Sequence, residues 1–140
     1  MLLPEMNEMI SSATGKVAGR KGTRRVLYVD DLRELREVAR IALSKAGHKI
    51  DTAPDGTDAL AMIIANPGAY DIVISDHHMG VMNGLELVIK LREIQYPGMI
   101  AIVSSEMNLD VADEYRRLGV ERLLYKPVEI SKLRALVLES

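Results

Sequence analysis

The hydrophobic pattern of the chain changes from irregular to regular near residue 24. From there to residue 140, short apolar runs alternate with longer segments in which apolar residues recur every three or four positions. The first longer segment carries Leu35, Ala39 and Leu43 and is followed by Gly47. This spacing predicts helices, and the short runs predict buried strands. The predicted strands cover residues 26–29, 49–53, 72–74, 99–103 and 123–125.

Five strand–helix units in succession favour an α/β fold. Strands separated by helices pair in parallel, and helices then cover both faces of the sheet. Right-handed crossovers leave few topologies, chiefly the flavodoxin-like strand order 2-1-3-4-5. We therefore expect residues 24–140 to form one domain built on a doubly wound, five-stranded parallel sheet.

Residues 1–23 lack the regular pattern of the rest of the chain. They are rich in Met, Ser, Gly and Ala, and basic residues gather where the segment ends. We predict a flexible N-terminal tail or linker, with at most a short helix at residues 5–12. A solvated tail is favoured over a docking arm, since no amphipathic period is long enough to supply core.

Composition narrows the possible classes of protein. The chain has 140 residues, 48% of them hydrophobic, with a formal net charge of −2 and no Cys, Trp or Phe. The absence of Cys excludes disulfides and thiolate metal sites, and the charge and aromatic content disfavour direct binding of nucleic acid. No apolar run approaches the roughly 18 residues of a membrane span. We expect a cytoplasmic protein without membrane or nucleic-acid partners.

Reactive side chains follow the predicted strands. Asp30 and Asp31 follow the first strand, Asp76 the third, Ser104 the fourth and Lys126 the fifth. The carboxyl ends of parallel strands share one edge of the sheet, where functional groups of such folds gather. With the first and third strands adjacent, we expect three carboxylates in one crevice, beside a hydroxyl and an ammonium group.

Three neighbouring carboxylates repel one another. At about 4 Å and an effective dielectric constant near 20, each pair costs roughly 4 kcal/mol. A raised pKa on one carboxyl or a bound hard cation relieves this repulsion, and oxygen ligands suit Mg²⁺. One carboxylate can then attack phosphorus while the metal offsets charge on the transferring group.

At these residues the chain resembles response-regulator receiver domains of two-component signalling, over residues 24–140. The resemblance rests on four motifs in order: Val29-Asp30-Asp31; Ser75-Asp76-His77-His78-Met79 continuing to Met82-Asn83-Gly84; Val103-Ser104-Ser105-Glu106; and Tyr125-Lys126-Pro127.

The resemblance implies a phosphoacceptor and a metal site. Asp76 matches the phosphorylated aspartate of the family. Asp31 matches a direct Mg²⁺ ligand, and Asp30 one that acts largely through water. Asp76 itself and the main-chain carbonyl of His78 would complete the protein ligands.

The resemblance also implies the phosphoryl-binding and lifetime-tuning groups. Ser104 matches the switch hydroxyl, and Lys126 the lysine that balances phosphoryl charge, with a cis peptide bond expected before Pro127. His78 and Glu106 occupy positions that flank the phosphoryl group. We expect the His78 ring to lean toward Glu106, so that the two side chains orient the attacking water.

Two positions depart from the family. Leu123 stands where an aromatic residue is usual, and we expect its absence to weaken the conformational change on phosphorylation. Tyr125 lies two residues further along the strand, on the same side if the strand is regular. Gly80 stands where proline is common, which loosens the loop without removing a ligand.

The adjacent histidines His77 and His78 are not expected to form a transition-metal site. Neighbouring residues of an extended chain point to opposite sides, and no further His or Cys is near in sequence.

The preferred function is a phosphorylated signalling switch rather than an enzyme. Its expected donor is a histidine kinase or a histidine phosphotransfer protein, and its target is unknown. The resemblance implies output through the fourth helix, fifth strand and fifth helix of a monomer or weak dimer. A phosphorylation-independent interaction module remains the alternative, and a phosphoaspartyl hydrolase is less favoured because its nucleophile follows the first strand.

Overall fold

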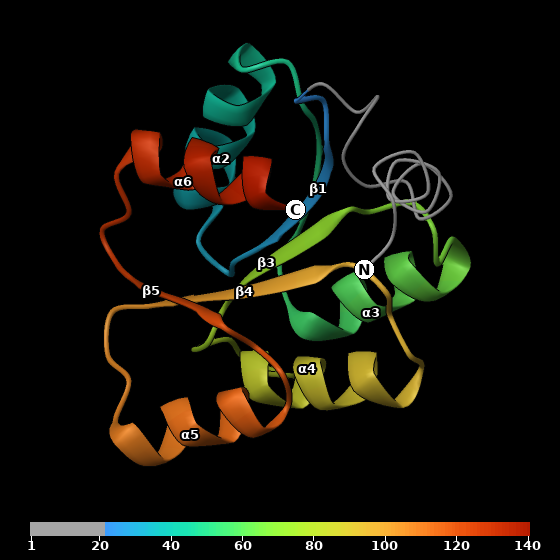
Figure 1. Cartoon of the computed structure of the whole chain (residues 1–140), viewed down its shortest axis with the longest axis vertical. Coiled ribbons are helices and arrows are strands. Elements are labelled where there is room, and N and C mark those ends of the chain that lie inside the picture. The colour runs from blue at the N-terminus through green and yellow to red at the C-terminus, as the bar shows by residue number, and fades with distance from the viewer. Residues whose placement is uncertain (1–21) are drawn as a thin grey trace, which may run out of the picture.

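One sheet of five parallel strands forms the centre of the structure, a computed structural model that describes residues 22–140 (Figure 1). The strand order is β2-β1-β3-β4-β5, which confirms the predicted topology. The strands are β1 (Arg25–Val29), β2 (Lys49–Ala53), β3 (Ile72–Asp76), β4 (Met99–Ser104) and β5 (Arg122–Tyr125). They alternate with the helices α2 (Arg33–Lys45), α3 (Gly56–Ala65), α4 (Gly84–Glu93), α5 (Leu109–Arg117) and α6 (Ile130–Glu139).

Helices cover both faces of the sheet. Figure 1 shows α2 and α6 on one face and α3, α4 and α5 on the other. Alternate side chains of each strand join different cores: in β1, Leu27 and Val29 face α3–α5, whereas Val26 and Tyr28 face α2 and α6. This two-sided burial explains why the strands read as continuous apolar runs in the sequence.

The first turn of α4 is held tightly against the end of β3. The Asn83 side chain accepts a hydrogen bond from the Glu86 main-chain N–H (2.9 Å), and the Glu86 carboxylate accepts one from the Asn83 N–H (3.0 Å). This reciprocal pair satisfies two N–H groups that a helix start leaves without partners. Gly84 permits the close approach, because a Cβ there would lie 2.7 Å from the main-chain oxygen of Asp76.

Element boundaries follow the sequence pattern closely. The predicted strand at residues 49–53 matches β2, whereas β3 continues past its apolar run and includes Asp76. Gly47 follows α2 with a φ of 95°, a conformation that favours glycine. Most of the predicted tail, with the possible helix at residues 5–12, lies outside the described residues. No helix within residues 22–140 combines the length and apolar character needed to cross a membrane.

The Asn83 cap gives a stability prediction. Replacing Asn83 by Ala should lower the free energy of unfolding by about 1 kcal/mol, because the Glu86 N–H loses its acceptor at the helix start. Urea denaturation followed by circular dichroism measures this change. Asn83→Ser keeps a capping oxygen and should lose much less. Equal losses in the two variants would show that capping is not what Asn83 contributes.

Candidate functional site

Three carboxylates gather at the carboxyl edge of the sheet, as the sequence predicted. In the β1–β3 pairing Val29 lies opposite Ser75, so Asp30 follows β1 beside Asp76, the last residue of β3. One carboxylate oxygen from each of Asp30, Asp31 and Asp76 lies within 4.8 Å of the other two. Asp30 and Asp76 are buried, and Asp31 is exposed to solvent.

Lys126 links two of these carboxylates. Its Nζ atom lies 2.9 Å from Asp30 Oδ2 and 3.3 Å from Asp76 Oδ2. The peptide bond between Lys126 and Pro127 is cis, as expected. Asp30 uses its other oxygen to accept a hydrogen bond from the main-chain N–H of Leu32 (2.9 Å). Asp30 is therefore satisfied on both oxygens, which leaves Asp76 and Asp31 as the more available carboxylates.

Burial and like charge make Asp76 resist ionisation. Burial raises the pKa of Asp76, the charge of Lys126 lowers it, and the charges of Asp30 and Asp31 raise it, with a net upward shift. Burial lowers the pKa of Lys126, but its hydrogen bond to Asp30 and the two acidic charges outweigh burial and raise it overall. Lys126 thus stays cationic in the pocket, where it offsets part of the carboxylate repulsion.

The Ser104 hydroxyl lies at the same edge and is held by the following loop. Ser104 Oγ donates to the main-chain oxygen of Glu106 (2.6 Å) and accepts from the Glu106 N–H (3.2 Å). The main-chain N–H of Lys126 donates to the Ser104 carbonyl (2.9 Å), which ties the end of β4 to the lysine. Ser104 is fully buried. Its hydroxyl therefore joins the site to the segment that leads into α5.

The two adjacent histidines do not point to opposite sides, so that expectation was wrong. Their ring centroids lie 4.7 Å apart with an edge-to-face orientation. The reason is that β3 ends at Asp76, and residues beyond a strand no longer alternate strictly. Within residues 22–140, the only cluster of three or more potential metal-ligating side chains is the aspartate group already described.

His77 has a partner that the sequence did not indicate. Its Nδ1 atom shares a 2.5 Å hydrogen bond with the hydroxyl of Tyr115, a fully buried residue of α5. In the sequence, Tyr115 lies at helical spacing from Ala112 and Leu118, which indicates an apolar helix face but no partner for its hydroxyl. The sequence did contain one indication of such a contact, a tyrosine at a core-facing helix position, because a buried phenol hydroxyl needs a hydrogen-bond partner.

The remaining predicted residues lie around this edge. His78 lines a cavity of about 350 Å³ with Asp31. No hydrogen bond or ion pair joins His78 to Glu106 in the described part of the chain, so their joint action stays a prediction. Leu123 is half-buried against the core beneath α3–α5. Tyr125 is 62% exposed and fills no part of that core.

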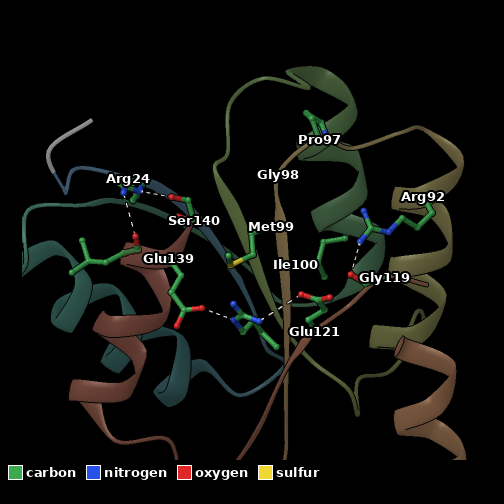
Figure 2. Close-up of a pocket in the computed structure, with 12 residues that line it drawn as sticks. Arg24, Arg92, Pro97, Gly98, Met99, Ile100, Gly119, Glu121, Glu139 and Ser140 are labelled. Atoms are coloured by element: carbon green, nitrogen blue, oxygen red, sulfur yellow. Dashed lines mark hydrogen bonds and ion pairs between the residues drawn. The ribbon is translucent and has the colours of Figure 1, made fainter. Parts of the chain in front are cut away.

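A second pocket, of about 490 Å³, lies at the opposite edge of the sheet (Figure 2). Its three arginines already have protein partners. Arg24 donates to the main-chain oxygens of Leu138 and Ser140, Arg92 donates to carbonyls after α5, and Arg122 pairs with two glutamates. We therefore assign the functional site to the carboxylate edge.

The electrostatics of Asp76 give a stability prediction. In metal-free buffer at pH 7, Asp76→Asn should raise the melting temperature by on the order of 3 °C, because it removes a charge that the fold disfavours. Because the pKa of Asp76 is higher in the folded than in the unfolded state, ionised Asp76 lowers the free energy of unfolding at pH values above its folded-state pKa. This destabilisation disappears at low pH, where Asp76 is protonated in both the folded and the unfolded state. The gain should thus shrink as the pH falls toward about 3, below the ordinary range of aspartate.

Thermal melts across this pH range measure the effect, with Asp58→Asn on the exposed surface of α3 as the control. A lower melting temperature of Asp76→Asn at pH 7 would instead show that the contact with Lys126 outweighs burial and repulsion.

Curated proteins similar to this chain are signalling proteins. The chain is 30% identical over 111 residues to two-component response regulator 24 of Arabidopsis thaliana, covering 79% of each protein. It is 32% identical over 110 residues to a response regulator receiver protein of Anaeromyxobacter sp., covering 79% of this chain and 45% of that protein. It is 33% identical over 116 residues to the aerobic respiration control sensor protein ArcB of Escherichia coli, covering 80% of this chain and 14% of the sensor. The chain thus spans less than half of the second relative and a small part of the third.

Solved structures agree with these relatives. Chemotaxis protein CheY4 of Vibrio cholerae superposes with a TM-score of 0.75 and 30% identity, covering 84% of this chain and 98% of that one. A response regulator receiver protein of Pseudomonas putida superposes with a TM-score of 0.77 and 28% identity, covering 89% and 100%. Residues 26–138 match the family described as response regulator receiver domain. This match, the strand order and the aspartate cluster together establish that the chain belongs to the response regulator receiver domain family.

Proposed function

We propose that this receiver domain takes a phosphoryl group onto Asp76 from a phosphohistidine of a donor protein, with Mg²⁺ as cofactor. The observation that carries the proposal is the carboxylate cluster at the end of β3. Asp76 ends a fully buried strand, has two further carboxylates within 4.8 Å, and contacts the Lys126 ammonium group. A nucleophile, a cation-binding group and a fixed positive charge therefore meet in one place.

The chemistry of the cluster suits Mg²⁺. Asp30, Asp31 and Asp76 offer hard oxygen ligands, and the family resemblance adds the main-chain carbonyl of His78. Since Lys126 occupies one oxygen of Asp30, ligation by Asp30 through water fits better than direct contact. When bound, the ion would reduce the negative charge of the transferring phosphoryl group and its neighbours.

The residues of the chain divide the transfer step among them. A carboxylate oxygen of Asp76 forms a bond to phosphorus while the bond from phosphorus to the donor imidazole nitrogen breaks, and its electron pair stays on that nitrogen. Lys126 balances charge on a phosphoryl oxygen. The Ser104 hydroxyl leaves the main chain of Glu106 and donates to another phosphoryl oxygen. Loss of the Ser104 contact would release the loop that precedes α5.

His78 and Glu106 are proposed to set how long the phosphoryl group remains. Each follows a central site residue by two positions, and His78 lines the cavity beside Asp31. With no direct hydrogen bond between them in residues 22–140, joint action on the attacking water requires that the water itself bridges the two side chains.

The proposed output surface consists of α5, β5 and α6. The β5 strand forms one edge of the sheet, and a depression of about 290 Å³ lies between it and α6. Because the loop before α5 starts at Ser104, a change at the phosphorylation site reaches this surface first. A downstream protein that binds here would distinguish the two states by the contacts it gains or loses.

The donor is proposed to dock on an apolar groove beside Lys126. This groove of about 410 Å³ lies between α2 and α6, and its lining is mostly apolar. Val38 and Ile130 line it and are 52% and 45% exposed. A helical face of a cytoplasmic histidine kinase or histidine phosphotransfer protein suits such a groove, because it would cover these side chains while its histidine approaches Asp76.

Labelling with a small phosphodonor tests the proposed function. Incubation with acetyl phosphate and Mg²⁺ should add one phosphoryl group to the full chain, measured by intact mass, and omission of Mg²⁺ should reduce the labelling strongly. Asp76→Asn should abolish it, because the amide is no nucleophile toward phosphorus, whereas Asp58→Asn should behave as wild type. Labelling of Asp76→Asn would refute the assignment, and an unlabelled wild type would favour the phosphorylation-independent interaction module.

A charge placed in the groove tests donor docking. Val38→Lys should slow phosphotransfer from a phosphorylated histidine phosphotransfer domain about tenfold, because it removes roughly 1.5 kcal/mol of apolar burial. Labelling by acetyl phosphate should not change, since the small donor needs no groove. Ile64→Lys on α3, where Ile64 is 54% exposed, is the matched control on the other face of the sheet. Equal slowing in both variants would show that the donor docks elsewhere.

A further inference from the structure

One partly buried hydrogen bond connects the residue after the proposed phosphoacceptor directly to helix α5. It joins Nδ1 of His77, the residue after Asp76, to the hydroxyl of Tyr115 at 2.5 Å. The two rings meet edge to face, with centroids 5.5 Å apart. Within residues 22–140, no other hydrogen bond links the loop after β3 to α5. The contact therefore joins two segments that are 38 residues apart in the sequence.

The fold leaves a fitted space for this hydroxyl. A Cβ at Gly84 would lie 2.8 Å from the Tyr115 hydroxyl oxygen, 2.7 Å from the Asp76 main-chain oxygen and 3.0 Å from the His77 Cα. These distances are too short for a real Cβ contact. Because Gly84 has no side chain, the Tyr115 phenol has room to reach the His77 ring beside the first turn of α4.

The main chain of His77 is fixed by two hydrogen bonds. Its N–H donates to the Val103 carbonyl (3.0 Å), and its carbonyl accepts from the Gly84 N–H (2.9 Å). With Tyr115 bound to its ring, His77 contacts β4, α4 and α5 at once. A displacement of the Asp76 main chain that moves His77 on phosphorylation would therefore strain at least one of these three contacts.

The electrostatic setting also couples Tyr115 to the site. Burial raises the pKa of the Tyr115 hydroxyl, and the charge of Asp76 raises it further. Burial and the neighbouring His78 lower the pKa of His77. The hydrogen bond between the two side chains lies one residue from the carboxylate whose charge phosphorylation would change.

Strand β5 carries no buried aromatic residue that could respond to phosphorylation in the same way. Leu123 contributes only hydrocarbon to the core beneath α3–α5, and Tyr125 is mostly exposed. Tyr115, in contrast, is fully buried in that same core. Tyr115 therefore places an aromatic ring of α5 itself next to the site, so that a movement of this ring accompanies a movement of the helix.

We infer that Tyr115 is a positioning residue that transmits the phosphorylation state of Asp76 to α5 through its hydrogen bond with His77. This inference rests on the proposed function, because it needs a phosphoryl group on Asp76. The bond differs between the unmodified and phosphorylated states, and α5 shifts with it. Leu123 replaces the usual aromatic residue and is expected to weaken the conformational change at β5. The route through His77 and Tyr115 does not involve β5 and is therefore not weakened by Leu123.

Removal of one hydroxyl tests the route. In Tyr115→Phe, amide chemical-shift changes of α5 on addition of beryllofluoride and Mg²⁺, a phosphoryl mimic, should fall to about half of the wild-type values or less. Changes around Asp30 and Lys126 should persist. Tyr96→Phe is the matched control: Tyr96 is also buried, and its hydroxyl donates to the Tyr70 carbonyl, away from the aspartate cluster. It should respond as wild type.

A second measurement uses the unchanged protein, in case Tyr115→Phe folds poorly. The ring ¹⁵N resonances of His77 should shift when the wild type is saturated with the mimic, because its partner hydroxyl moves. Unchanged His77 resonances, or wild-type α5 changes in a folded Tyr115→Phe, would overturn the inference.

Intact-mass labelling by acetyl phosphate separates this result from the proposed function. A wild type that takes no phosphoryl group refutes the proposed function. A labelled protein in which α5 responds without the Tyr115 hydroxyl refutes only the route through His77.

Discussion

Repulsion among three carboxylates within 4.8 Å is the constraint on which the rest of the site depends. The parallel sheet imposes it, because β1 and β3 are neighbours and both end at the same edge. Lys126 relieves the repulsion only in part, since its ammonium group contacts Asp30 and Asp76 while Asp31 faces solvent. The domain thus folds around an excess of negative charge that a bound cation or protonation of one carboxyl can reduce. Any change in the charge of the site therefore acts on carboxylates that already repel one another.

A rearrangement of the carboxylates affects neighbouring segments because the residues around the site are held by short, specific hydrogen bonds. Ser104 is held by the main chain of Glu106, and His77 by β4, α4 and the ring of Tyr115. The core beneath these groups is closely packed and cannot absorb a shift by gradual deformation. A rearrangement at the carboxylates is therefore expected to reach the loop before α5 and the helix itself, rather than to fade within the sheet.

Much of this arrangement could be predicted from the sequence, for physical reasons. Continuous apolar strands that alternate with amphipathic helices permit few topologies, and the strand order then brings Asp30, Asp31, Asp76 and Lys126 together. The orientation of the two histidines could not be obtained in this way, since residue 77 lies beyond β3 and strand alternation no longer applies. The partner of Tyr115 was also hidden, because helical periodicity assigns a residue to a face but not its hydroxyl to an acceptor. The half-burial of Leu123 and the exposure of Tyr125 depend on how α5 packs against β5, which no local pattern encodes.

The slot at Gly84 has a consequence for how this sequence can diverge. Any side chain at position 84 would collide with the Tyr115 hydroxyl and with the main chain of Asp76, whereas a small residue at position 115 would leave a void beside Gly84. A smaller residue at position 115 cannot compensate for a side chain at position 84, because the collision with the main chain of Asp76 would remain. The main chain of Asp76 therefore requires the glycine whatever residue stands at 115, and the buried tyrosine depends on the glycine rather than the reverse.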